Sequence, residues 1–188
     1  MIAGVDEAGR GPLAGPVTVA AVILKTIPDG LNDSKKLSEK KRTALLPLIK
    51  SMSVAWSVVH VSPEEIDDMN ILQATLWGMQ QAVQQLEVQP IEVLVDGNQV
   101  PKMTLPCRAL VGGDGLEACI SAASIIAKCH RDSLMLEAHQ KFPEYGFNQH
   151  KGYPTKAHME ALSKWGPCAI HRRSFAPVRA AEQQGLFV

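Results

Sequence analysis

The sequence predicts an α/β fold in which helices flank a mixed sheet of five strands. Short apolar runs rich in β-branched residues alternate with longer segments that have helix-forming patterns. The first two runs are separated only by a stretch rich in glycine and proline, which favours an antiparallel pair. A chain of 188 residues with 46% hydrophobic residues is long enough to form one compact domain with a full core.

The first half of the chain is expected to alternate between buried strands and capped helices. Ile2–Glu7 and Val17–Leu24 are the apolar runs that predict the first strand pair. Ser38 is placed to cap a helix that ends near Ser51. The segment 62–65 reads SPEE, which is a capping box with proline at the first helical position. The remaining elements expected here are a strand over Met52–Val61 and a helix from Asn70 to about Leu86.

The second half is expected to add two strands and a long helix. Ile91–Val95 and Cys107–Val111 have the composition of short strands, and each runs into a glycine-containing turn. The strongest helix spans about Leu116 to Phe142, and its small residues at 121–124 suggest close packing or the close approach of a ligand. The remaining elements are a loop over Pro143–Pro154, a helix from Thr155 to near Gly166 and a last short helix.

Charge is balanced over the whole chain but segregated along it. The formal net charge is +0, which argues against a uniformly basic nucleic-acid binder. No lysine or arginine occurs between Lys50 and Lys102, whereas Lys141–Arg179 holds seven of them against two acids. The C-terminal third could therefore bind a polyanion, or the two regions could be differently solvated helical faces.

The chain shows none of the sequence features of export or membrane insertion. Its start has no basic segment followed by an apolar one, and no apolar run reaches the roughly 18 residues of a membrane span. We therefore expect a cytoplasmic protein with no membrane contact. The four cysteines are scattered, which favours reduced thiols over disulfides or a zinc site.

Histidine and tryptophan residues are assigned mainly to structure. His158 is expected on a helix surface and His171 in a basic turn, which leaves His150 as the candidate neighbour of a site. Trp56, Trp77 and Trp165 fall in strand or helix patterns and are expected in the core.

Four carboxylates follow the predicted strands at positions where a site can form. Strand ends in an open α/β sheet are where loops converge, so these acids would meet if the strands are neighbours. Clustered carboxylates repel one another unless a divalent cation binds, and oxygen ligands favour Mg²⁺ or Mn²⁺. Two such ions are a common apparatus for phosphodiester cleavage. The alternative is that the later acids, each beside glycine, simply form turns. The four residues are Asp6, Glu7, Asp96 and Asp114.

The glycine run after Glu7 does not fit a nucleotide phosphate loop. The segment GRGPLAGP lacks the Lys-Ser/Thr of a P-loop, and its prolines would make a poor entry to a helix.

Six motifs give the chain a resemblance to a known family. They read DEAGRGPLAGPV, LNDSKKLS, VDGN, ISAASIIAK, YGFNQHKGYPT and HRRSF, and in this order they resemble bacterial ribonuclease HII from Ile2 to about Val178. The resemblance implies a ribonuclease H-like fold in a single domain over residues 1–188. Residues from about 143 to 188 would form a C-terminal loop and helical substrate-binding region and tail. It also implies a monomer.

The resemblance further implies an endoribonuclease that acts on RNA–DNA hybrids and on ribonucleotides embedded in duplex DNA. Metal-activated water would attack the phosphate on the 5′ side of a ribonucleotide and leave a 3′-hydroxyl and a 5′-phosphate. The family's metal ligands, which hold Mn²⁺ or Mg²⁺ in a two-ion mechanism, fall on Asp6, Glu7, Asp96 and Asp114.

Recognition of the RNA-to-DNA junction is assigned by the resemblance to two places in the chain. Gly9, Arg10 and Gly11 match the family's junction-reading motif, and glycine lets the backbone approach the 2′-hydroxyl closely. Tyr153 matches the tyrosine that stacks on the deoxyribose following the ribonucleotide. Phosphate contacts are expected from a further set of basic residues, namely Lys35 or Lys36, Lys128, Arg172 and Arg173. The chain departs from the family at Gly112, where lysine is common.

The last residues resemble a motif for binding the bacterial sliding clamp. In the ending QQGLFV, Gln183 would hydrogen-bond at the rim of a groove that receives Leu186 and Phe187. The alternative is a tail that folds back over its own core.

Two other functions compete with this assignment. One is a nuclease of the same fold without junction specificity, which would not need Gly9-Arg10-Gly11 or Tyr153. The other is a non-catalytic hybrid-binding protein, which would gain nothing from carboxylates that face phosphates.

Overall fold

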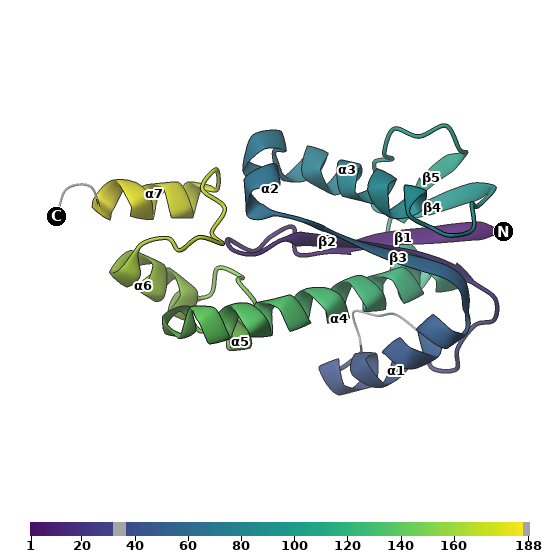
Figure 1. The fold of residues 1–188 in the computed structure, drawn as a ribbon, viewed down its shortest axis with the longest axis horizontal. Helices are drawn as coiled ribbons and strands as arrows, with labels where there is room; N and C mark the ends of the chain where they lie inside the picture. Colours follow the sequence, from purple (N-terminus) through teal and green to yellow (C-terminus); the bar gives the residue numbers. More distant parts are fainter. Residues whose placement is uncertain (32–36, 186–188) are drawn as a thin grey trace. The chain divides into compact units, whose positions relative to one another are not determined.

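The computed structural model describes residues 1–31 and 37–185 (Figure 1), and it divides into two compact units that we describe separately. We call them the sheet unit and the helical unit. The sheet unit comprises Met1–Ala8, Thr18–His60 and Thr75–His130, and the helical unit comprises Gly9–Val17, Val61–Ala74 and Arg131–Val188.

The five predicted strands form one mixed sheet in the order β3-β2-β1-β4-β5. The expected antiparallel pair is confirmed, because β1 pairs with β2 so that Asp6 lies opposite Ala20. β1 is parallel to β4, and β4 is parallel to β5. Central strands are buried on both faces, which explains why the first two are continuous apolar runs. The strands are β1 (Ile2–Ala8), β2 (Val17–Leu24), β3 (Ser53–Val61), β4 (Glu92–Asp96) and β5 (Cys107–Leu110).

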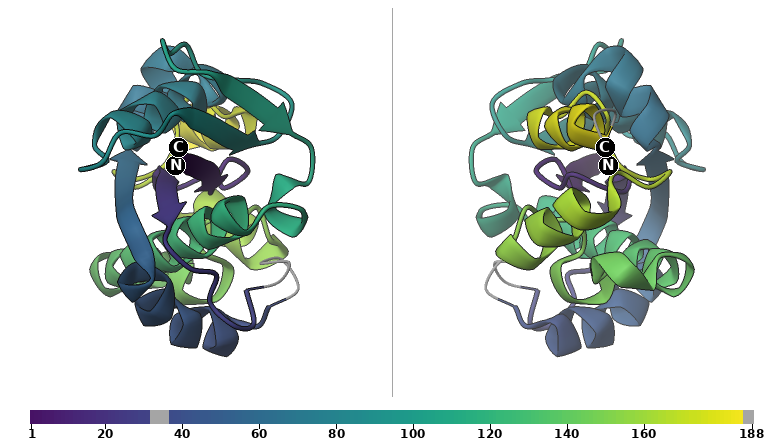
Figure 2. Two further views of the ribbon diagram at one scale, coloured as in Figure 1. Left: turned by 90° about the vertical axis from the view of Figure 1, so that its right-hand side faces the viewer. Right: turned by 90° about the vertical axis from the view of Figure 1, so that its left-hand side faces the viewer.

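Helices cover both faces of the sheet in this unit (Figures 1 and 2). α1 (Glu39–Ser51) and the first half of α4 (Ala118–Lys141) share an apolar cluster with β2, whereas α3 (Ile71–Gln84) packs on the other face. The backbones of β1 and α4 are in direct contact, because a Cβ atom added to Gly4 would lie 2.2 Å from the carbonyl carbon of Cys119. The small residues of α4 therefore serve close helix-to-strand packing.

The helix starts predicted from the sequence are confirmed. The Ser38 hydroxyl accepts from the backbone N–H of Lys41 at the start of α1. Ser62 and Glu65 form both hydrogen bonds of the capping box at the start of α2 (Pro63–Met69). The Asn70 side chain accepts from the first N–H groups of α3. Side chains thus satisfy backbone donors that a helix leaves unpaired in its first turn.

The helical unit packs around aromatic residues. Tyr145 and Phe147 are buried and stack with their ring centroids 5.4 Å apart, and Ala14 and Met135 complete this cluster. The segment predicted as a loop from Pro143 therefore contains two short helical turns that bury these rings. The elements of this part are η3 (Pro143–Tyr145), α5 (Phe147–His150), α6 (Lys156–Trp165) and α7 (Ala176–Gly185).

Two of the tryptophans expected in the core are exposed. Trp56 is 37% exposed on edge strand β3, and Trp165 is 55% exposed at the last position of α6. Each indole instead lies against a lysine ammonium group, that of Lys50 at 4.1 Å and that of Lys164 at 4.5 Å from the ring centroid. The four cysteines are present as thiols, but they are partly buried, whereas the sequence predicted buried thiols. Among the described residues, we find no helix with the length and apolar character needed to cross a membrane.

Candidate active site

The four predicted carboxylates all lie in the sheet unit, at the same end of three adjacent parallel strands. Asp6 and Glu7 lie near the end of β1, and Asp96 is the last residue of β4. The registers pair Val5 with Val95 and Asp96 with Leu110. Asp114 follows β5, in the short helical turn η2 (Gly113–Gly115). Parallel pairing therefore places the four residues as the sequence argument expected.

Asp6 is buried among like charges. Asp6 is 3% exposed, and burial raises the pKa of its carboxyl group well above the ordinary value, as do the negative charges of Glu7 and Asp96. Hydrogen bonds from Ser124 and from the backbone N–H of Glu7, the latter 2.7 Å long, oppose this rise. The site therefore holds a carboxylate whose negative charge is energetically costly without a cation.

The turn that carries Asp114 is fixed beneath Asp96. The Gly113 backbone N–H donates to Asp96 Oδ1 at 2.7 Å. A Cβ atom at Gly113 would lie 2.6 Å from Ile120 Cδ1 and 3.2 Å from Leu110 Cβ, so a larger residue there would have to displace these side chains. Gly112 has φ 68°, a left-handed conformation that glycine adopts without cost, and it faces open space. The departure from the family's common lysine therefore suits the backbone at this position.

The carboxylates fit a divalent cation in their chemistry and in their place on the sheet. They offer only oxygen donors, which Mg²⁺ and Mn²⁺ prefer. The mutual electrostatic effect of Asp6, Glu7 and Asp96 shows that at least these groups lie near one another. Within residues 1–31 and 37–185, however, no three acidic, histidine or cysteine side chains approach closely enough to bind one ion.

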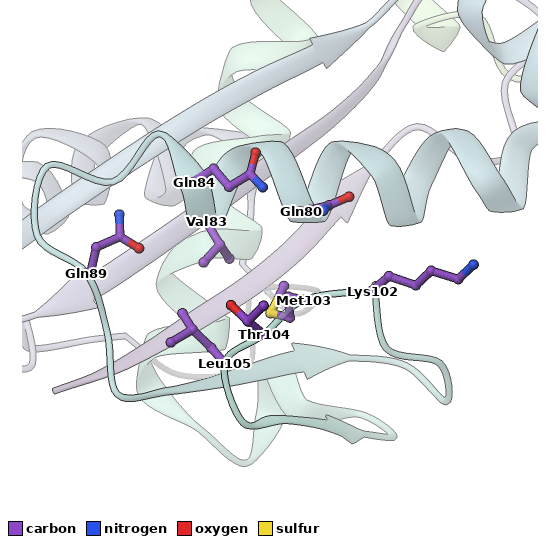
Figure 3. A pocket seen from close by; sticks show the side chains of 8 residues that line it. All are labelled: Gln80, Val83, Gln84, Gln89, Lys102, Met103, Thr104 and Leu105. Atoms are coloured by element: carbon purple, nitrogen blue, oxygen red, sulfur yellow. The ribbon is translucent and has the colours of Figure 1, made fainter.

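A separate groove of about 560 Å³ in the sheet unit contains none of the predicted site residues (Figure 3). It lies between α3 and the segment before β5. Its lining is mixed, with three glutamines, one lysine and apolar side chains. These residues are Gln80, Val83, Gln84, Gln89, Lys102, Met103, Thr104 and Leu105.

The predicted junction-reading residues lie in the helical unit, on the loop Gly9–Pro16. Arg172 holds this loop from within the protein. Its side chain is fully buried and donates to the carbonyl oxygens of Gly9 at 2.6 Å, Arg10 at 3.0 Å and Gly15 at 2.9 Å. Its backbone N–H also donates to the carbonyl of Leu13 at 2.8 Å. One residue thus binds four carbonyl groups of the loop.

Arg131 holds the same loop and the segment that bears Tyr153. It is also fully buried, and it donates to the carbonyls of Pro16 at 3.0 Å, Ala14 at 3.1 Å and Lys151 at 3.0 Å. Burial lowers the pKa of Arg131 to about 10 and that of Arg172 to about 9, so both remain cations at neutral pH.

Gly11 and Tyr153 are neighbours. A Cβ atom at Gly11 would lie 3.6 Å from Tyr153 Cε1, which is ordinary van der Waals contact. Tyr153 is 39% exposed, and the Arg131 guanidinium carbon lies 5.8 Å from its ring centroid. Arg10 is exposed on the loop between the two glycines. The helical unit therefore brings together the residues to which the resemblance assigned junction recognition.

The basic residues that were predicted to contact phosphates differ in burial and in their partners. The expectation for Arg172 is corrected, because its guanidinium is buried and donates to loop carbonyls. Arg173 is exposed, and its side chain forms an ion pair with Glu182. Lys128 is partly buried on α4. Lys35 and Lys36 lie outside the described residues.

The expected surface position of His158 is corrected, because His158 is buried and is joined by a hydrogen bond to His171, which is also buried. The Cys168 backbone N–H donates to His171 Nδ1 at 3.0 Å, so the His171 proton is on Nε2. The His171 Nε2–H group donates to His158 Nε2 at 3.0 Å. The His158 Nδ1–H group in turn donates to the Tyr153 carbonyl oxygen at 2.9 Å. His150 stacks on His158 with 4.5 Å between ring centroids. Neutral imidazoles thus position the backbone of Tyr153.

The buried, hydrogen-bonded His171 predicts that the folded protein loses stability in acid. Burial and the nearby His158, Arg173 and His150 lower the pKa of His171 to about 4. As the pH falls from about 6.5 to about 4, the unfolded chain binds a proton that the folded chain does not, so the free energy of unfolding falls by about 3 kcal/mol.

Urea unfolding across this pH range measures the effect. Other groups titrate in the same range, so the informative quantity is the difference between the wild type and His171→Asn, which keeps an acceptor for the Cys168 N–H. The variant should be less stable at neutral pH and should lose less stability on acidification. Parallel pH profiles for the two proteins would contradict the assignment.

Sequence reasoning missed Arg131 and the histidine chain. Arg131 carried no signal of its burial, because it follows Lys128 and His130 and precedes Asp132, in the polar half of the longest predicted helix. The histidines carried no such signal, because their partners are brought together only by the fold.

The chain is similar to proteins of known activity over most of its length. A profile of the Ribonuclease HII family matches residues 3–178. Ribonuclease HII of Dechloromonas aromatica is 56% identical over 182 residues, which cover 95% of this chain and 92% of that protein. Ribonuclease HII of Vibrio parahaemolyticus is 57% identical over 183 residues, with 96% and 87% covered.

Solved structures show the same fold. Ribonuclease H2 from Pyrococcus horikoshii has a TM-score of 0.80 at 29% identity and covers 97% of both chains. Ribonuclease HII from Archaeoglobus fulgidus, solved in a complex with PCNA, has a TM-score of 0.77 at 28% identity, with 92% of this chain and 93% of that chain covered. Bst ribonuclease HIII, solved with Mn²⁺, has a TM-score of 0.64 at 18% identity, with 100% and 70% covered. The predicted ribonuclease H-like fold is confirmed.

Proposed function

We propose that this chain, which belongs to the ribonuclease HII family and is an endoribonuclease of ribonuclease H type 2, cuts on the 5′ side of ribonucleotides embedded in duplex DNA. The observation that supports this proposal most is that the chain carries both a set of carboxylates and a set of residues suited to reading the junction. The carboxylates end the strands of the sheet unit, and the loop with Gly11 packs beside Tyr153 in the helical unit. Only Ala8 separates Glu7 from Gly9 in the sequence.

The carboxylates are proposed to hold two divalent ions, Mn²⁺ or Mg²⁺. When bound, the ions supply the Lewis-acid chemistry that activates the attacking water and stabilises the leaving oxygen. Asp96, fixed by the Gly113 N–H, and Asp6, held by hydrogen bonds from Glu7 and Ser124, are pre-oriented for this role. Cleavage then leaves a 3′-hydroxyl and a 5′-phosphate. The ligands are Asp6, Glu7, Asp96 and Asp114.

Junction recognition is proposed to rest on close approach of the backbone. Gly11 has no side chain between the loop and the Tyr153 ring, so a sugar can reach both. The 2′-hydroxyl is both a donor and an acceptor, which lets peptide groups distinguish ribose from deoxyribose. The exposed Tyr153 ring can stack on the deoxyribose that follows the ribonucleotide. A ribose at that position would carry a second 2′-hydroxyl, which would clash with the ring.

The test is incubation of the protein with a DNA duplex that contains one ribonucleotide, with Mg²⁺, with Mn²⁺ and with chelator. We expect one metal-dependent cut on the 5′ side of the ribonucleotide. The same duplex without the ribonucleotide should stay intact. A cut in the presence of chelator, or on the 3′ side, would contradict the proposal.

A sliding clamp is proposed as a partner through the C-terminal tail. The archaeal ribonuclease HII above was solved with PCNA, which supports a clamp partner for this chain. Gln183 is exposed near the end of α7, and Leu186 and Phe187 lie outside the described residues.

Deletion of residues 183–188 should therefore abolish binding to a bacterial sliding clamp and leave hydrolysis of a short duplex unchanged. Surface plasmon resonance with immobilised clamp measures the first property. A double substitution, Leu186→Ala with Phe187→Ala, is the matched variant that keeps the chain length. Equal clamp binding by the wild type and the truncated protein would show that the tail is not the clamp-binding segment.

A further inference from the structure

Two buried arginines surround the loop Gly9–Pro16, and neither is available for a phosphate. Arg131 and Arg172 are both 0% exposed. Their side chains donate six hydrogen bonds to carbonyl oxygens, five of which belong to this loop. Burying a guanidinium costs free energy unless its donors are satisfied, and here carbonyl groups satisfy them. An arrangement of this kind defines the orientation of the peptide groups that accept the bonds.

The orientation matters most at Gly9 and Arg10. Their carbonyls point at the Arg172 guanidinium, with contacts of 2.6 Å and 3.0 Å. The peptide bonds are trans, so the N–H of the following residue points opposite to each carbonyl. The N–H groups of Arg10 and Gly11 therefore point away from Arg172. Successive N–H groups with one orientation form a concavity that favours oxygen atoms carrying negative charge.

The cation behind these peptide groups strengthens them as donors. A hydrogen bond to a charged group polarises the peptide, and polarised chains of hydrogen bonds are stronger in a buried setting. Arg131 adds a second constraint, because it joins the loop at Ala14 and Pro16 to Lys151, two residues before Tyr153. The loop and the tyrosine segment are thus held by one side chain.

We propose that Arg172 and Arg131 are positioning residues for junction recognition, which turn the N–H groups of Arg10 and Gly11 toward the sugar and phosphate oxygens of the substrate and fix Tyr153 beside them. This inference rests on the proposed function. It assigns recognition at this step to backbone donors rather than to the carbonyls of Gly9 and Arg10. It also gives Arg172 no direct contact with nucleic acid.

Substitution of Arg172 by lysine and by glutamine tests the inference. Lysine keeps the charge but cannot span three carbonyls with one nitrogen. The readout is the junction preference, which is kcat/KM for a duplex with one ribonucleotide divided by kcat/KM for a uniform RNA–DNA hybrid. We expect this ratio to fall by about tenfold or more in both variants, the size of one charge-assisted hydrogen bond. Arg131→Lys should lower it as well, and the exposed Arg179→Gln should leave it unchanged.

A second readout separates positioning from direct contact. Each lost phosphate contact reduces the magnitude of the negative slope of log affinity against log salt by about 0.9 for duplex DNA. The slope, measured with chelator present, should not change in the Arg172 variants. A folded Arg172→Lys that keeps the full junction preference would overturn the inference. So would a reduction of about 0.9 in the magnitude of this slope with the junction preference intact.

If a variant does not fold, an NMR measurement on the wild-type protein tests the inference. The backbone amide protons of Arg10 and Gly11 should shift downfield when an RNA–DNA hybrid binds in chelator, as seen by NMR. Unchanged shifts on binding would contradict the inference. A wild-type junction preference near one would instead contradict the proposed function, and the amide shifts would still test the orientation of the loop.

Discussion

Asp6→Asn should abolish cleavage while leaving the protein at least as stable as the wild type. Asparagine keeps an oxygen that can accept from the Glu7 N–H and Ser124, but it cannot supply a carboxylate to a divalent ion. The loss in kcat should be on the order of 10³-fold, the upper range for removing one charge-stabilising group from an active site. Single-turnover cleavage of a duplex with one ribonucleotide measures it.

The predicted stability of Asp6→Asn follows from the loss of a negative charge. Asp6 is buried beside Glu7 and Asp96, so its neutral replacement removes repulsion and a desolvation cost. We expect a gain of about 1 kcal/mol in the free energy of unfolding at neutral pH without metal. Urea unfolding in chelator measures this gain. Asp29→Asn, an exposed position in the same unit, is the control and should change neither property.

Binding distinguishes a catalytic defect from a folding defect. Asp6→Asn and Asp96→Asn should both still bind the duplex in chelator, since the loop Gly9–Pro16, which is proposed to read the junction, lies in the other unit. Cleavage retained by both variants would mean that other carboxylates hold the ions.

Gly11→Ala should remove junction preference without harming the fold, whereas Gly9→Ala should harm the fold itself. The alanine methyl group at Gly11 would meet only the Tyr153 ring, at 3.6 Å, so the free energy of unfolding should change by less than about 1 kcal/mol. That methyl group would, however, lie beside the Tyr153 ring, next to Cε1 and Cδ1, where the sugar is proposed to bind. A displacement of about 1 Å in substrate position can cost about 10²-fold in rate, which is the loss we expect on a single-ribonucleotide duplex.

Gly9 differs because its backbone is left-handed and tightly packed. It has φ 95°, and a Cβ atom there would lie 1.9 Å from the Nε atom of buried Arg131. Gly9→Ala should therefore destabilise the protein by about 2 to 4 kcal/mol, measured by urea unfolding. The two glycines of one motif thus serve different purposes. A Gly11→Ala variant with full junction preference, or a Gly9→Ala variant as stable as the wild type, would contradict this division.

Local chemistry was well predicted from the sequence. The capping box at Ser62 and Glu65 depends on residues three apart, so its pattern is visible in the chain and the structure confirms it. The convergence of the strand-end acids was predicted only on the condition that their strands are neighbours, and the parallel pairing of β1 with β4 meets this condition and places Asp6 and Asp96 at one end of the sheet.

Long-range partners could not be predicted in the same way. Arg172 looked like a surface cation in a basic turn, yet its carbonyl partners Gly9 and Gly15 lie 163 and 157 residues earlier in the chain. His171 looked similar, but its partner His158 is brought to it by folding. A lone basic residue has no sequence pattern that reveals whether it faces solvent or buried acceptors. The structure decides this through burial, and in both cases it assigns the residue to support of the reading loop and Tyr153.

The central claim is that one substrate is cut by the carboxylates at a place chosen by the glycine loop and Tyr153. Mapping the cut in a DNA duplex that contains a short tract of consecutive ribonucleotides tests it most directly. We expect a single dominant cut on the 5′ side of the last ribonucleotide, next to the DNA, and loss of this dominance in Gly11→Ala. Cuts distributed evenly along the tract by the wild-type protein would contradict it.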